Sequence, residues 1–487
     1  MGRELNLAVR GRQLVEKLRF FASSPIHSFI ILAGVFGMLI IALTPPLTGG
    51  DEEAHFIRAY GISEGNFIIR SNEEVSMPKS YRQTLGCLQD KKPVAGDTYT
   101  YSYDRYAESK KVGLQCALTL KQGSGDREYI STTASGYSPL TYIPQVSAII
   151  IGRLLNFPIV LTVYLVRIFT LIAYIGLIAG AIWLMPRRKW ALVGMALLPV
   201  PLMQVTNPGG DYMLMGASAI LVATVLYSRS LKEARLSRQG AGLVYAVAIS
   251  GVLLVTTKGF FPGICFLPLI LFFAGLKKWI GKKMLILGGI IAVAFLWQMI
   301  GAPIIEDSST HAATTGTVFT LPHAFLKTMF FKAGFHSWVD SDFIYNGPGL
   351  GLNSPVGMPA IVITLMNMLV GIYVFAEYSK SRTRDVFSKL ENRALLFTGI
   401  SVCVAIVLGI FAALYLLAWN IQKGDDIING VATRYFYPGF LLLAVLPFNR
   451  YIKTTQRFYV YATLIGSIII LSTQCIAIAL RYKWGML

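Results

Sequence analysis

The sequence predicts an all-α polytopic membrane protein that crosses the bilayer about eleven times, and three observations support this. Hydrophobic residues make up 54% of the 487 positions and charged residues only 14%, whereas soluble domains carry about 25% charged residues. The apolar residues fall into blocks of roughly 17–25 residues, the length at which a helix crosses the hydrocarbon layer. Basic residues, which give a net charge of +19, lie mainly in short links between these blocks. That placement is typical of cytoplasmic loops near anionic lipid and argues against a nucleic-acid partner.

The apolar blocks follow a basic lead-in, residues 1–25, that we expect in the cytoplasm. The first span is predicted at 26–43. The others are predicted at 158–185, 190–206, 212–228, 241–257, 260–276, 284–303, 357–378, 395–419, 436–448 and 458–480.

One further apolar block, residues 139–156, decides the topology. Counted as a span, it would place the basic "PRRK" link (186–189) outside. Treated as a helix lying in the outer interface, it leaves every short basic link on the cytoplasmic side, as the positive-inside rule expects. We therefore predict eleven spans, with the amino terminus inside and the carboxyl terminus outside.

Two long segments then face outward. The first, residues 44–157, is polar and rich in tyrosine and ends in the in-plane juxtamembrane helix; the second covers residues 304–356. Spans two to seven lie between them, in residues 158–303, and residues 357–487 hold spans eight to eleven and a short outer tail. We expect short helices and irregular structure around a cleft in the outer segments, and the sequence contains no internal repeat.

The cysteines divide into two groups. Cys87 and Cys116 share the first outer segment, where a disulfide is allowed but not required. Cys265, Cys403 and Cys475 lie in apolar blocks and are expected to be buried.

A cluster of ionisable residues, "DEEAH" (51–55), follows the first span. As a helix start, it places Asp51 at the N-cap and Glu52 and Glu53 in the first turn, where the helix dipole favours carboxylates. Asp51 and His55 are four residues apart and would share one helix face. Two carboxylates and an imidazole there could abstract a proton or bind a divalent cation. The spacing alone leaves the capping and the functional interpretation open.

Motifs along nearly the whole chain resemble the bacterial membrane-protein family DUF2142. "PPLTGGDEEAHFIRAYGISEGNF" (45–67) is similar to the family's opening motif, a proline-led break followed by an acidic pair, His-Phe, Arg-Ala-Tyr and Gly. The other matching stretches, in the same order as in the family, are "YSPLTYIPQ" (137–145), "ALLPVPLMQVTNPGGDYMLMGASAIL" (196–221), "LLVTTKGFFPGICFLPLILF" (253–272), "GFHSWVDSDF" (334–343) and "VATRYFYPGFLLLAVLP" (431–447).

The layout of that family is in turn similar to the C-type (GT-C) membrane glycosyltransferases. In those enzymes the first span leads to a large outer loop with a catalytic Asp. Juxtamembrane helices follow, then a second span with an Arg, and a later outer turn with another acid. The resemblance implies that Asp51 is the catalytic base with Glu52 beside it, that Arg167 is the second-span Arg, and that Asp211 is the later acid.

This resemblance implies transfer of a sugar from a polyprenyl-phosphate carrier to an envelope polysaccharide, on the outer face of a bacterial cytoplasmic membrane. Such a reaction needs cations near the departing phosphate and a carboxylate that takes the proton of the acceptor hydroxyl. Arg167, Lys258 and Arg434 are the candidate phosphate contacts, although each could instead be an interfacial anchor or a structural partner. Trp338 and Asp340 could bind an acceptor sugar, or serve as an interface aromatic and a turn cap.

A metal site and two non-enzymatic functions are also compatible with the sequence. A divalent cation, Mg²⁺ or Mn²⁺, could be held if oxygens of Asp51, Glu52 and Asp211 converge. The protein could be a transporter or flippase for lipid-linked sugars, or a non-catalytic assembly protein. A transporter typically shows repeats and polar residues near the midplane of several spans, so a polar cluster at the outer rim favours the enzyme.

Overall fold

The computed structural model describes most of the chain, and every structural statement below refers to its described residues. These are residues 24–47, 51–69, 73–89, 110–122, 126–134, 137–204, 208–231, 233–257, 263–274, 280–301, 359–378, 389–416, 436–446 and 452–482.

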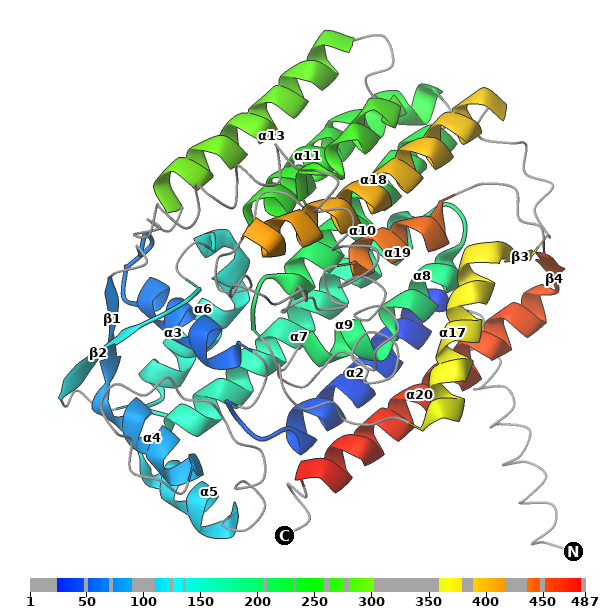
Figure 1. Cartoon of the computed structure of the whole chain (residues 1–487). Coiled ribbons are helices and arrows are strands. Elements are labelled where there is room, and N and C mark those ends of the chain that lie inside the picture. Colours follow the sequence, from blue (N-terminus) through cyan, green and yellow to red (C-terminus); the bar gives the residue numbers. More distant parts are fainter. Residues whose placement is uncertain are drawn as a thin grey trace, which may run out of the picture.

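Long apolar helices dominate the described part of the chain. Five are long and apolar enough to cross a membrane, and they run roughly alongside one another in Figure 1. They are α2 (Pro25–Leu43), α7 (Ile159–Leu184), α10 (Asp211–Ser230), α11 (Glu233–Thr257, from Gln239) and α20 (Gln456–Tyr482, to Leu480). Three more long helices are α13 (Ile280–Gly301), α17 (Ala360–Phe375) and α18 (Lys389–Leu416). An all-α, multi-pass membrane protein therefore fits the structure.

α10 lies at the centre of this bundle and packs against α7, α11 and α19 (Tyr437–Val445). Close packing depends on small residues, because a methyl group at Gly216 of α10 would lie 2.6 Å from the Leu177 side chain of α7. Gly37 of α2 approaches Leu171 of α7 in the same way. Small residues at helix contacts are the usual device of membrane bundles, where backbones approach closely.

Three of the predicted spans are not continuous spanning helices in the residues that the structure describes. The described part of residues 190–206, which ends at Gln204, holds α8 (Lys189–Ala196) and α9 (Pro199–Met203), because proline at 199 and 201 interrupts helical hydrogen bonding. Of residues 260–276, the described part holds the short 3-10 helix η4 (Leu267–Phe272). α19 has 9 residues, a rise of about 14 Å. Eleven continuous spanning helices are thus not confirmed.

The broken pair α8 and α9 nevertheless joins the two ends of the bundle. Arg188, just before α8, donates hydrogen bonds to backbone oxygens of Tyr373, Ala376 and Ala444, at the ends of α17 and α19. Beyond α9, Gly209 lies against the His55 side chain. The side chains of α8 from Trp190 onward and all those of α9 are buried, so protein rather than lipid surrounds this pass.

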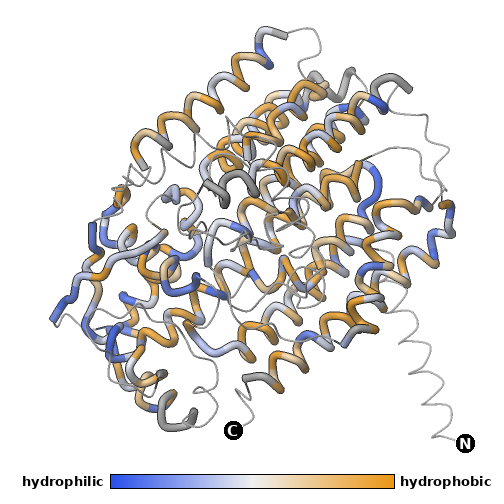
Figure 2. Tube along the Cα trace, viewed as in Figure 1, coloured by the Kyte–Doolittle hydropathy of each residue, from blue (hydrophilic) through white to orange (hydrophobic). Residues whose placement is uncertain are grey.

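A polar layer covers one end of the bundle, and Figure 2 shows hydrophilic residues gathered in it. Its elements are α3 (Glu52–Ser63), β1 (Glu74–Pro78), α4 (Lys79–Gln89), α5 (Lys110–Thr119), β2 (Arg127–Ser131), η2 (Pro139–Tyr142) and α6 (Ile143–Leu154). β1 and β2 pair antiparallel. Cys87 of α4 and Cys116 of α5 form a disulfide with Cα atoms 5.8 Å apart. At the opposite end, β3 (Ala376–Tyr378) pairs in parallel with β4 (Ile452–Thr454).

The charge pattern of the sequence predicts that the Arg188 end faces the cytoplasm and the polar layer faces outward. Ser230, exposed at the end of α10, is a suitable probe, whereas the neighbouring Ser228 is fully buried. Ser230→Cys should react with a membrane-impermeant maleimide only in inverted vesicles. Asp126→Cys, at an exposed position beside β2, should react in intact cells. The reverse labelling pattern would overturn the topology.

Candidate functional site

The three consecutive carboxylates after α2 lie in different environments. Successive side chains of a helix are about 100° apart around its axis, so neighbouring side chains point in different directions. Asp51 is exposed, Glu52 is buried, and Glu53 is half-buried. Asp51 occupies the N-cap position in the left-handed region, with φ 61°, and makes no side-chain capping hydrogen bond. The predicted capping role therefore does not explain this carboxylate.

Glu52 forms a buried, two-pronged ion pair with Arg167 of α7. Arg167 Nε donates to Glu52 Oε1 at 2.6 Å, and Nη2 donates to Oε2 at 2.8 Å. The Arg167 side chain is 0% exposed and the Glu52 side chain is 1% exposed. Such fork-to-fork pairs are short and strong because both hydrogen bonds are charge-assisted.

The same guanidinium caps the end of α2. Nη1 donates to the Thr44 carbonyl oxygen at 2.6 Å, and Nη2 to that of Pro45 at 2.7 Å. Carbonyls at a helix end lack partners within the helix, so Arg167 supplies donors that α2 itself cannot. The sequence left open a structural role for Arg167, and the buried carboxylate that pairs with it is Glu52.

His55, one turn into α3, is anchored in an aromatic cluster. Its Nδ1 lies 2.7 Å from the Tyr142 hydroxyl of η2, and its ring meets the Tyr137 ring edge-on at 4.9 Å. Burial raises the pKa of Tyr142 well above its usual value, and the neighbouring Tyr137 adds to the increase. Tyr142 thus stays protonated at neutral pH and can donate to the imidazole.

The turn before α10 packs against this cluster. A methyl group at Gly209 would lie 2.5 Å from His55 Nε2. Gln145 of α6 donates to the Pro208 carbonyl at 3.2 Å, and the Tyr212 hydroxyl donates to the Thr141 carbonyl at 2.6 Å. These contacts bring Asp211, the first residue of α10 and only 1% exposed, to the same end of the bundle as α3.

The described residues contain no group of three or more His, Cys, Asp or Glu side chains that could hold a metal ion. Asp51, Glu52 and Asp211 are therefore not gathered into the divalent-cation site that the sequence left open. The Glu52 carboxylate is instead engaged with Arg167.

Glu53 is a residue whose environment sequence reasoning missed, since the helix dipole seemed to account for it. Burial raises the pKa of its carboxyl; the nearby Tyr81 hydroxyl lowers that pKa, and the Glu52 charge raises it, for a net increase. Tyr81 in turn stacks on Phe56 of α3, with ring centroids 5.9 Å apart. No signal in the sequence marks this contact, because Tyr81 belongs to α4, a different helix.

Four predicted site residues lie outside the residues that the structure describes. They are Lys258, Arg434, Trp338 and Asp340. Their roles remain predictions.

The fold and this site define a polytopic α-helical membrane protein whose polar end is tied to the bundle by a buried ion pair. A family model for predicted membrane proteins, DUF2142, matches residues 35–444, so the chain belongs to that family, as its motifs predicted. No curated protein and no solved structure matches the chain.

Loss of the Glu52 carboxylate should destabilise the protein. Glu52→Gln leaves the Arg167 charge buried without its counter-ion, which typically removes about 3–5 kcal/mol of stability. Arg167→Lys should also destabilise, because an ammonium cannot hold the carboxylate and two carbonyls in one plane. Thermal unfolding of the purified protein in detergent measures both. Asp51→Asn, at an exposed position, is the control with unchanged stability. A Glu52→Gln protein as stable as wild type would contradict this account.

Gly209 should tolerate no side chain. Gly209→Ala drives a methyl group into the His55 ring, and overpacking of this kind typically removes about 1–3 kcal/mol. Gly176→Ala is the matched control, since nothing lies within 4 Å of the added methyl group on α7. Equal thermal stability of the two variants would show that the turn does not depend on this close approach.

Proposed function

We propose that this protein is a GT-C-like glycosyltransferase of the bacterial cytoplasmic membrane. It transfers a sugar from a polyprenyl-phosphate carrier to an envelope polysaccharide on the outer face. The observation that carries the proposal is the exposed Asp51 carboxylate, presented at the junction of α2 and α3 by the buried Glu52–Arg167 pair beneath it.

Rigid presentation matters because a general base acts only within hydrogen-bond reach of its proton. The end of α2, the start of α3 and the middle of α7 meet at one guanidinium. Asp51 immediately precedes Glu52, so the ion pair limits the movement of its backbone. Glu52 and Arg167 are in this view positioning residues, which do not touch the substrate.

The proposed step is an inverting displacement. Asp51 accepts the proton of an acceptor hydroxyl as that oxygen bonds to the anomeric carbon of the donor sugar. The bond between this carbon and the phosphate oxygen breaks, and polyprenyl phosphate leaves with the electron pair. One well-placed base is sufficient for inversion, whereas retention uses a second carboxylate as nucleophile.

The remaining groups of the site have supporting roles in this proposal. Asp211 and the His55–Tyr142 pair shape the polar end of α10 and α3. Lys258 and Arg434 are the cations that we propose for the departing phosphate, and Trp338 and Asp340 are the candidates for acceptor contact. Arg167 holds the Glu52 side chain and the backbone after α2 in place, because its N–H groups donate to Glu52 and to backbone carbonyls.

Substitution of the proposed base tests the function. In a deletion strain, wild type should restore the envelope glycan, whereas Asp51→Asn should leave one sugar absent from an intact backbone. A general base contributes about 10²–10⁴-fold to rate, so the missing sugar should fall below detection in composition analysis. Asp126→Asn, an exposed acid of the same polar layer, is the control that should restore the glycan.

The outcomes separate the proposal from its rivals. A normal glycan from the Asp51→Asn strain would remove the assigned base. Loss of the whole polysaccharide from the deletion strain, with lipid-linked precursor accumulating on the cytoplasmic side, would indicate a flippase instead. Transfer of a radiolabelled sugar from its polyprenyl phosphate by the purified wild-type protein, absent with Asp51→Asn, would support the enzyme directly.

A further inference from the structure

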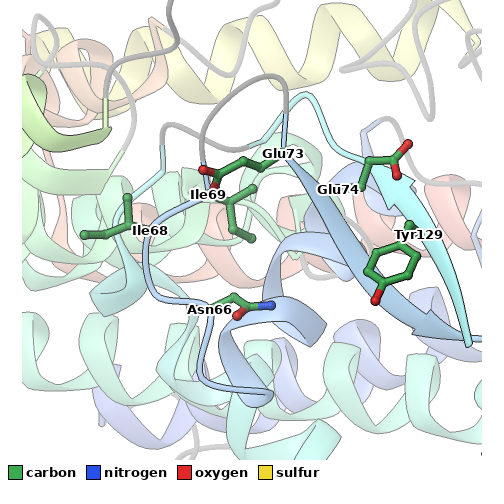
Figure 3. Close-up of a pocket in the computed structure, with 6 residues that line it drawn as sticks. All are labelled: Asn66, Ile68, Ile69, Glu73, Glu74 and Tyr129. Carbon is green, nitrogen blue, oxygen red and sulfur yellow. The ribbon is translucent and has the colours of Figure 1, made fainter.

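A pocket of about 440 Å³ lies in the polar layer, away from the Asp51 end of α3. Its lining residues come from the segment after α3, from β1 and from β2, and Figure 3 labels them. They are Asn66, Ile68, Ile69, Glu73, Glu74 and Tyr129. The volume falls within the range of about 300–1,000 Å³ typical of small-ligand sites.

The wall formed by the segment after α3 is fixed by a buried guanidinium. Arg58 is 0% exposed and donates to the carbonyl oxygens of Asn66 at 3.3 Å and Phe67 at 2.8 Å. Gly65 adopts φ 97°, which favours glycine, and the Asn66 N–H donates to the Gly61 carbonyl. The wall is therefore preformed, which lowers the entropy lost when a ligand binds.

The opposite wall presents an aromatic ring. Tyr129 lies on β2 opposite Ser76 of β1 and is 65% exposed. Arg127, two residues earlier, donates to the Ser76 hydroxyl at 2.9 Å and pairs with Glu64 of the segment after α3 at 3.2 Å. These bonds hold the strand pair against the end of α3, and the Tyr129 ring on this strand is open to solvent.

The chemistry of this lining fits a neutral polyhydroxylated ligand. Carboxylates of Glu73 and Glu74 accept hydrogen bonds from hydroxyl groups, and the Asn66 amide can donate and accept. The Tyr129 ring and the Ile68 side chain can contact the apolar C–H face of a sugar ring. None of the six described lining residues is basic, so these residues offer no cation to a phosphate, and the described residues hold no metal-binding group.

We propose that this pocket is a saccharide-binding subsite that holds the acceptor polysaccharide at a distance from the reacting end. α3 is 12 residues long and therefore separates the pocket from Asp51 by about 18 Å. Binding energy gained on a remote part of a substrate can hold its reacting end in place. The acceptor is accordingly a chain of several sugars, not a free monosaccharide. That this ligand is the acceptor rests on the proposed function. That the pocket binds a saccharide does not rest on it.

Binding of oligosaccharides to the full-length protein in nanodiscs tests the subsite. The probe is the envelope polysaccharide of the source organism, partially hydrolysed to oligosaccharides, observed by saturation-transfer difference NMR. Tyr129→Ala should weaken binding by about ten-fold through loss of stacking, and Tyr129→Phe should retain it because the ring remains. Tyr245→Ala removes a tyrosine that is 68% exposed on α11, outside the pocket, and serves as the matched control.

The outcomes for binding and for catalysis are distinguishable. Asp51→Asn should bind the oligosaccharides as wild type does, so the subsite stands even if the transferase proposal fails. No binding to wild type, or equal binding to Tyr129→Ala and Tyr245→Ala, would overturn the subsite. Binding of a lysine-rich peptide but not of the oligosaccharides would show that the pocket is an acidic surface for basic peptides. That result would also overturn the saccharide subsite.

Discussion

The buried pair between Glu52 and Arg167 is the interaction on which the geometry of the polar end depends. Burial of two charges is unfavourable unless the remaining donors and acceptors are satisfied. Arg167 meets this condition with two bonds to the carboxylate and further bonds to the carbonyls of Thr44 and Pro45. Those carbonyls belong to the two residues that directly follow α2, where the helix supplies no donors. The Arg167 side chain of α7 thus connects the end of α2 to the start of α3. It also supplies the charge that makes burial of the Glu52 carboxylate possible.

This clamp explains why adjacent residues have separate roles. The i, i+4 spacing of Asp51 and His55 predicts a shared face only if the backbone is helical at both positions. Asp51 instead lies in the left-handed region just outside the helix, so its carboxylate is exposed while His55 is buried against Tyr142. The bulky Leu47 also has φ 61°, an uncommon value for such a residue. The surroundings of Leu47 and Asp51 therefore impose these two backbone conformations.

Sequence predicted the ends of α2, α7 and α20 to within a few residues, because long apolar runs have few alternative structures in a bilayer. It did not predict the broken pair α8 and α9 in residues 189–203, since lipid and a protein interior select the same apolar residues. It singled out Asp51, Glu52 and Arg167 individually as candidate site residues. It could not pair Glu52 with Arg167, which are 115 positions apart, because no periodicity carries a contact of that range. The environment of Glu53 could not be predicted for the same reason, because it depends on a separate helix, α4.

The broken pass also has a physical reason to lie where it does. Non-helical backbone at membrane depth is tolerated only where protein covers it, and Leu197 and Leu198, between α8 and α9, are 0% and 6% exposed. One end of this pass begins at Arg188, whose guanidinium holds the ends of α17 and α19. The other end leads to the turn that packs against His55. A straight apolar helix needs no such cover, and composition alone predicts it correctly. Of the three predicted spans that are not continuous helices, this one connects the interior of the bundle to the candidate site.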